Sequence, residues 1–235
     1  MMVGRFAGVL AALVVLAGCD SEVPPAAPVA QATRAAVGEA PVSGPERHIL
    51  AFGNSLFAGY NVAPDEAYPA RLQAALRARG INADVVNAGV SGDTTQAGRA
   101  RLAFTLDAQE EVPDLVILEL GGNDLLRGLP VAETRANLAA MLAELRGRGI
   151  PVLLMGMRAP PNLGADYVAQ YDVIYPELAE EYGAELVPFF LESVYDQPQL
   201  IQQDRVHPTA EGIEALVAAT VDEVVQALPE IEEQL

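Results

Sequence analysis

The sequence predicts an α/β fold built on a parallel sheet. Short runs of continuously apolar residues recur along the chain, as expected of strands that are buried on both faces of a sheet. Longer segments with apolar residues at helical spacing alternate with these runs. Strands and helices that alternate in this way form parallel sheets with right-handed crossover connections.

Five short apolar runs are the expected strands. Each is followed by a glycine, an asparagine or a proline that begins a loop. The expected strands cover residues 48–52, 84–86, 115–120, 152–155 and 184–187.

Five longer segments are the expected helices, which are recognised by their apolar faces and their ends. Leu72 and Leu76 share one face of the first helix, and a glycine or a proline follows four of the five. Asp93 is expected to cap the second helix, because a carboxylate accepts hydrogen bonds from the free N–H groups of a first turn. The expected helices cover residues 68–79, 94–109, 131–148, 167–182 and 209–228.

Residues 1–18 are expected to be a signal peptide. Arg5 supplies a short positive region, and the apolar stretch after it is shorter than the roughly 20 residues of a membrane span. The stretch ends in Leu16-Ala17-Gly18-Cys19, which resembles the lipobox of bacterial lipoproteins. This resemblance implies that Cys19 is lipidated and becomes the new N-terminus. An ordinary signal peptide with a cysteine near its cleavage site is the alternative.

A linker is expected over residues 19–46 and a folded domain over residues 47–235. Prolines and alanines are interleaved in the linker, and no apolar periodicity is present. Proline favours extended backbone, so at ~3.1 Å per residue the linker could hold the domain up to roughly 80 Å from a bilayer. A disordered tail without a function is the alternative.

The charge balance excludes several classes of partner. The chain has 14 Lys plus Arg against 32 Asp plus Glu, a formal net charge of −18. Binding to nucleic acid or to anionic lipid by charge alone requires a basic surface. The single cysteine excludes an internal disulfide and a cysteine-based zinc site, and two histidines are too few for a multi-histidine metal site.

Polar residues follow the expected strands, where parallel sheets bind their ligands. Ser55 comes after the first strand, on a turn that begins with Gly53, and can act as a nucleophile. Histidine titrates near neutral pH, so His207 can act as the base. Asp204 lies three residues earlier in the same loop and can hold the imidazole in the required tautomer.

The same loops contain donors for the oxyanion that forms when an ester is cleaved. The backbone N–H groups of Ser55 and Gly92 and the side-chain amide of Asn123 can supply them. Each of these residues also has an ordinary turn or cap role; Asp124 is expected to be a cap, and His48 to be structural with no acid nearby. The complete set predicts acyl transfer through a serine nucleophile.

These residues resemble the motifs of the GDSL, or SGNH, hydrolase family. The resemblance covers about residues 47–228 and is strongest to the branch of bacterial acyl-CoA thioesterase I, also described as an arylesterase and lysophospholipase. It implies a three-layer, flavodoxin-like sandwich of about five parallel strands, and a two-step acyl transfer that needs no metal or organic cofactor. The family's Ser, Gly, Asn and Asp-x-x-His elements match Ser55, Gly92, Asn123, Asp204 and His207.

Segments 55–60, 157–164 and 186–190 also resemble that branch. One position departs from it, because Asn54 stands where the family has the aspartate of Gly-Asp-Ser-Leu. Asparagine keeps the shape and one acceptor oxygen of aspartate but lacks its charge. We therefore expect Asn54→Asp to leave the enzyme active.

The resemblance implies that the substrates are aryl esters, lysophospholipids or acyl thioesters. Pro160, Leu163 and Tyr167 are expected to line an apolar groove, a rigid proline turn being the alternative. The net charge disfavours the anionic CoA group. Two other functions stay open: a carbohydrate O-deacetylase of the cell envelope, and a catalytically silent, lipid-anchored binding protein.

The N-terminal segment implies a location in the cell envelope. Cys19 is expected to anchor the protein in a membrane, with the catalytic domain in the periplasm. Asp20 resembles an inner-membrane retention signal of some bacteria. We expect a monomer, because a parallel sheet covered by its own helices needs no partner.

Overall fold

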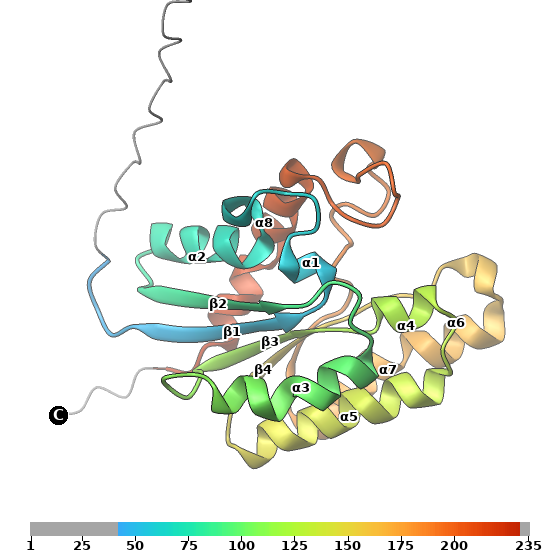
Figure 1. The fold of residues 1–235 in the computed structure, drawn as a ribbon, viewed down its shortest axis with the longest axis horizontal. Coiled ribbons are helices and arrows are strands. Elements are labelled where there is room, and N and C mark those ends of the chain that lie inside the picture. The colour runs from blue at the N-terminus through green and yellow to red at the C-terminus, as the bar shows by residue number, and fades with distance from the viewer. Residues whose placement is uncertain (1–41, 231–235) are drawn as a thin grey trace, which may run out of the picture. The chain divides into compact units, whose positions relative to one another are not determined.

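The computed structural model describes residues 42–230, in which five parallel strands form one sheet (Figure 1). The strand order is β2-β1-β3-β4-β5, so the chain places β2 on one side of β1 and β3 on the other. The predicted sheet of about five parallel strands is confirmed. The strands are β1 (Arg47–Gly53), β2 (Ala83–Gly89), β3 (Leu115–Glu119), β4 (Val152–Met155) and β5 (Glu185–Val187).

Helices cover both faces of the sheet and produce three layers. The helices α2 and α8 pack together on one face, while α3, α5 and α7 lie on the other (Figure 1). Of the helices in residues 42–230, none has the length and apolar character needed to cross a membrane. The α-helices are α1 (Ser55–Ala58), α2 (Tyr68–Ala78), α3 (Thr95–Asp107), α4 (Gly122–Leu126), α5 (Val131–Gly147), α6 (Ala165–Asp172), α7 (Ile174–Tyr182) and α8 (Ala210–Ala227).

The central strands form the core and fix the loops that follow them. All of β3 and the last five residues of β1 are buried, whereas Val86 and Asn87 of the edge strand β2 are exposed. Burial of apolar surface contributes ~25 cal/mol per Å². The strands that carry most of this burial therefore hold the turns at their carboxyl ends in place.

The segment predicted as one helix over residues 167–182 consists of two helices. The first, α6, ends at Asp172, and α7 begins at Ile174. Pro176 explains the break, because proline lacks the N–H that would bond to the carbonyl of Asp172 and its ring clashes with that carbonyl. The carboxylate of Asp172 instead accepts a hydrogen bond from the N–H of Ala159 at 2.8 Å.

The sequence predicts Asp93 as the cap of α3, and this prediction is wrong. Thr94 takes that place, and its hydroxyl accepts a hydrogen bond from the N–H of Ala97 at 3.3 Å. Asp93 forms an ion pair with Arg101 at 2.7 Å instead. The short helices α1 and α4 were not predicted either, because four or five residues are too few to show an apolar period.

The strand order creates a crevice at the carboxyl edge of the sheet. The connections that leave β1 and β3, which are neighbours, run toward opposite sides. In doubly wound sheets, ligands bind at such a switch point, outside the carboxyl ends of the strands. Ser55 and Asn123 follow these two strands directly.

Candidate active site

Ser55 stands on a tight turn between β1 and α1. A Cβ atom at Gly53 would lie 2.8 Å from the ring of Phe57 and 2.9 Å from the carbonyl of Glu119, so no side chain fits there. The Oδ1 atom of Asn54 accepts a hydrogen bond from the N–H of Leu56 at 3.0 Å and begins the short helix. The chain therefore turns abruptly and directs Ser55 toward the crevice.

His207 connects Ser55 to Asp204. The Nε2 atom of His207 lies 2.8 Å from Oγ of Ser55, and its Nδ1 atom lies 2.7 Å from Oδ2 of Asp204. Partial burial by itself would raise the pKa of Asp204, but hydrogen bonds from the backbone and ring of His207 and from the N–H of Val206 outweigh it and lower that pKa. The carboxylate stays charged beside the imidazole, as the sequence had suggested for a base and its orienting acid.

Two residues that the sequence analysis did not select hold the His207 loop. The ring of Tyr60 lies against the imidazole of His207, with centroids 4.3 Å apart. The side-chain amide of Gln202 donates to the carbonyl of Tyr60 at 2.9 Å, and its backbone N–H donates to the carbonyl of His207 at 2.7 Å. Neither residue follows a strand, which is why the strand-end criterion missed both.

Three groups can act as oxyanion donors around the hydroxyl of Ser55. The N–H groups of Ser55 and Gly92 donate to no other atom within residues 42–230. Gly92 has a φ of 87°, a conformation that favours glycine. The amide nitrogen of Asn123 donates one proton to the carbonyl of Asp93 at 2.9 Å, which leaves its second proton available. Ser55, Gly92 and Asn123 line one cavity of about 230 Å³, together with His207.

A buried carboxylate joins the two loops that carry Gly92 and Asn123. Asp124 accepts hydrogen bonds from the N–H of Thr95 at 2.8 Å and from its hydroxyl at 2.5 Å. Asp124 thus caps the first turn of α3 from a neighbouring helix, a cap role that the sequence suggested without indicating its target. This link fixes the distance between the two loops.

A larger apolar groove adjoins the cavity at Ser55. Its volume is about 550 Å³, and it shares Gly122, Leu126 and Val206 with the smaller cavity. Pro160 lines it, as the sequence predicted, but Leu163 and Tyr167 do not. Its apolar wall includes Leu125, Met157, Phe189, Leu191, Tyr195 and Ile201.

Leu163 and Tyr167 have other surroundings than the lining of this groove. Leu163 belongs to a single 3-10 turn and is 44% exposed. Tyr167 stacks on Tyr171, with ring centroids 6.1 Å apart, so that its ring supports α6. The segment that replaces them, residues 189–201, lies beyond β5 and has no strand or long helix to reveal its role.

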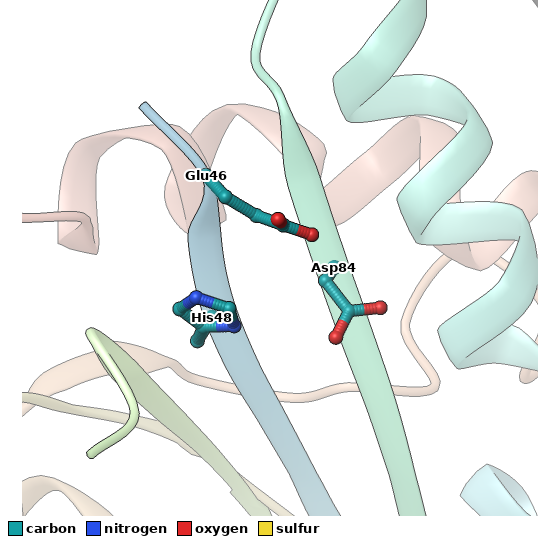
Figure 2. A group of neighbouring side chains, drawn as sticks. All are labelled: Glu46, His48 and Asp84. Carbon is teal, nitrogen blue, oxygen red and sulfur yellow. The ribbon is translucent and has the colours of Figure 1, made fainter. Parts of the chain in front are cut away.

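His48 lies at the opposite edge of the sheet from Ser55. Its Nε2 atom is 3.0 Å from a carboxylate oxygen of Glu111, so the expectation that no acid lies nearby is wrong. Glu46 and Asp84 stand beside it at the start of β1 and β2, with one possible metal-ligand atom from each residue within 4.8 Å of the others (Figure 2). Because these residues lie at the amino-terminal ends of β1 and β2, the group is separate from the cavity at Ser55, which lies beyond the carboxyl ends of the strands.

Comparisons with known proteins decide the family. Residues 51–215 match the model of the GDSL-like Lipase/Acylhydrolase family. The chain belongs to this family. The resemblance seen in the sequence and the α/β sandwich that it implied are both confirmed.

Similar proteins are esterases by name. An arylesterase of Vibrio mimicus is 39% identical over 180 residues, which are 77% of this chain and 89% of that protein. Thioesterase 1/protease 1/lysophospholipase L1 of Escherichia coli K12 is 40% identical over 164 residues, 70% of this chain and 76% of that protein. The crystal structure of AlinE4, an SGNH-hydrolase family esterase, covers 80% of this chain and 100% of its own, at 63% identity and a TM-score of 0.68. This GDSL family member is a serine esterase.

Two further AlinE4 structures bear on the pairing of Ser55 with Asp204. In one structure a serine is replaced by alanine, and in the other an aspartate is replaced. The two positions are as far apart along AlinE4 as Ser55 and Asp204 are along this chain.

Asn54 gives this GDSL hydrolase a buried amide–carboxyl pair beneath Ser55. Its side-chain nitrogen donates to Oε1 of Glu119 at 3.0 Å, and its backbone N–H donates to Oε2 at 3.3 Å. Glu119 is fully buried at the end of β3, and this burial raises its pKa to about 7, although the hydrogen bonds from Asn54 oppose the shift. An aspartate at this position would put two carboxyl groups in contact.

The raised pKa of Glu119 makes stability depend on pH. Because the folded protein binds this proton more tightly than the unfolded chain, the stabilisation is complete below a pH of about 4.5 and is lost as the pH rises through about 7. Asn54 limits the loss, since its amide can donate to the ionised form.

We expect Asn54→Asp to fold and to hydrolyse esters at neutral pH, but to lose stability faster than the parent protein above a pH of about 7. Two carboxyl groups in contact must share a proton, and removing it leaves two buried like charges. Tm measured between pH 5 and pH 9 tests this expectation. Glu119→Gln in the same background restores an amide–carboxyl pair and should remove the steeper fall.

Asn162→Asp is the matched control, because it adds the same charge at an exposed position. Parallel curves of Tm against pH for Asn54→Asp and for the parent would contradict the pairing argument.

Proposed function

We propose that this esterase works through Ser55 as the nucleophile, His207 as the general base and Asp204 as the residue that orients the imidazole. The continuous hydrogen-bonded path from Ser55 through His207 to Asp204 carries the proposal, with distances of 2.8 and 2.7 Å. Such a path lets one proton leave the hydroxyl as the hydroxyl attacks a carbonyl.

The reaction proceeds in two steps that use the same groups. The Oγ atom of Ser55 bonds to the ester carbon, and its proton moves to Nε2 of His207. The carbonyl oxygen becomes an oxyanion, which accepts hydrogen bonds from the N–H groups of Ser55 and Gly92 and from the amide of Asn123. The C–O or C–S bond then breaks, and the leaving alcohol or thiol takes the proton from His207. Water, deprotonated by His207, cleaves the acyl-enzyme in the same way.

The substrates proposed here are esters with an apolar part, including aryl esters, lysophospholipids and acyl thioesters. The apolar groove next to Ser55 supports this choice, because it extends beyond the cavity in which the reaction takes place. Carbohydrate O-deacetylation would leave this groove unused. Comparison of turnover on acetyl esters with turnover on longer acyl esters separates the two activities.

The proposed location is the cell envelope, with the domain in the periplasm and anchored through a lipid on Cys19. The sequence Leu16-Ala17-Gly18-Cys19 supports this part of the proposal, and these residues lie outside the described range. The predicted linker, most of which also lies outside it, would connect the anchor to β1. The esterase is proposed to act as a monomer, since its own helices cover both faces of the sheet.

Ser55→Ala should abolish hydrolysis of an aryl ester and prevent formation of an acyl-enzyme, because it removes the hydroxyl that is hydrogen-bonded to His207. A fluorophosphonate probe, followed by mass spectrometry of the labelled peptide, should modify Ser55 in the parent protein and leave the variant unlabelled. Residual turnover by the variant would contradict the assignment. An unlabelled, inactive parent protein would instead favour the silent binding protein.

Asn123→Ala should lower kcat by roughly a hundredfold, equivalent to ~3 kcal/mol, with a small effect on KM. The lost amide interacts with the oxyanion of the transition state more strongly than with the bound ester. Steady-state kinetics on an aryl ester measure the effect. Because Asn123 also binds the carbonyl of Asp93, Tm must be measured in parallel. A fall in kcat below tenfold in a folded variant would remove Asn123 from the oxyanion site.

Cys19→Ser should release a soluble esterase from the membrane fraction, because serine cannot receive the lipid. Fractionation of cells that express the full chain, with esterase activity as the readout, tests this outcome. Unchanged membrane association of the variant would contradict the lipid anchor.

A further inference from the structure

The charged residues that line the apolar groove are all cationic. Arg158 and Arg205 contribute to its wall, and no aspartate or glutamate among residues 42–230 does. This is the opposite of the chain as a whole, in which acidic residues outnumber basic ones to give a formal net charge of −18. A cationic lining therefore distinguishes the groove from the average composition of the chain.

Arg205 has a guanidinium group without a partner. Within residues 42–230 every other arginine side chain has a hydrogen bond, an ion pair or an aromatic ring as its partner, whereas that of Arg205 has none. The residue has a φ of 61°, an uncommon left-handed conformation outside glycine. It lies between Asp204 and His207, so the chain places an unpaired cation beside the proposed base.

Arg158 provides a second cation from a different loop, between β4 and α6. Its guanidinium lies over the ring of Phe189, 5.3 Å from the centroid, and 3.9 Å from a carboxylate oxygen of Glu192. Both side chains of that ion pair are at least half exposed, so the pair is weak and leaves Arg158 able to bind an anion.

The groove leads directly to the nucleophile. It shares Gly122, Leu126 and Val206 with the cavity that contains Ser55. A substrate whose ester carbonyl lies at Ser55 can therefore place one of its arms in the groove. The apolar wall suits a hydrocarbon chain, and the guanidinium groups suit a carboxylate or a phosphate on that arm.

We propose that Arg205 and Arg158 make this esterase selective for anionic amphiphilic esters, in which the arm that occupies the groove carries a carboxylate or a phosphate. The proposal rests on the esterase function of Ser55 and names the class of substrate for that site. Two kinds of ester carry such an anion. In one the carboxylate lies at the far end of the acyl chain, and in the other the phosphate lies on the alcohol.

Two matched substrate pairs test the proposal and distinguish these sources. The first pair is the mono-(p-nitrophenyl) ester of adipic acid and its analogue with a methyl-capped carboxylate. The second pair is lysophosphatidic acid and the monoacylglycerol with the same acyl chain. For each pair the quantity measured is the ratio of kcat/KM for the anionic ester to kcat/KM for the neutral ester.

Arg205→Gln should lower this ratio by about tenfold in the pair whose charge lies in the groove, because one charge-assisted hydrogen bond of ~1.5 kcal/mol is lost. Arg205→Lys should retain part of the preference. Since Arg205 is next to Asp204, Arg158→Gln supplies an independent variant on another loop, and it should lower the same ratio. Increasing salt should lower the ratio in the parent protein and should not lower it in the double variant, in which only the screened repulsion by the net charge remains.

Arg79→Gln is the matched control, because it removes the same charge at the end of α2, where Arg79 pairs with Asp222. An unchanged ratio in both pairs for Arg205→Gln and Arg158→Gln would overturn the proposal, and so would an equal fall in Arg79→Gln. Turnover of the neutral esters is a separate readout: if the parent protein cleaves none of them and none of the anionic esters, the esterase function itself fails.

Discussion

The hydrogen bond between His207 and Ser55 joins residues that are 152 positions apart in the chain, and the active site depends on it. No local sequence pattern can hold two atoms 2.8 Å apart over that separation. The parallel sheet does so, because every strand delivers its following loop to the same edge. Ser55, Gly92 and Asn123 follow β1, β2 and β3, which are adjacent in the sheet. His207 comes from a loop after the last strand and is the member that needs additional support.

Buried carboxyl groups supply much of the positional accuracy. Asp124 and Glu119 are both almost inaccessible to solvent, and within the described part of the chain neither has a cation as a hydrogen-bond partner. Burial of a carboxyl group costs free energy unless hydrogen bonds compensate for it, so each forces the donors around it into fixed positions. Asp124 fixes Thr95 and thereby the loop of Gly92, whereas Glu119 fixes the turn that carries Ser55 through Asn54. The two carboxyl groups fix the positions of the loops around the active site, at some cost in the free energy of unfolding.

The sequence predicted those parts of the site that strand ends determine. Ser55, Gly92 and Asn123 could be found because an apolar run ends shortly before each of them, and His207 because an acid precedes it by three residues. The groove could not be found in this way. Its wall includes Phe189, Tyr195 and Ile201, which belong to irregular chain after β5, where no period marks the inward side chains. Tyr60 and Gln202 were missed because neither of them follows a strand directly. The break before α7 was predictable from Pro176. That Thr94 caps α3 in place of Asp93 was not predictable, because it depends on the ion pair between Asp93 and Arg101.

Long-range and short-range electrostatics act in opposite directions in this protein. A net charge of −18 repels an anionic substrate as it approaches, but solution ions screen this repulsion over about 8 Å at physiological ionic strength. The guanidinium groups of the groove act at contact, where part of the water is displaced and screening is weaker. Added salt therefore accelerates the approach of every anion while it weakens only those bound states that use Arg158 or Arg205. The two effects on the turnover of anionic esters can accordingly be separated. Added salt weakens the binding of anions by the groove, but it also weakens their repulsion by the net charge.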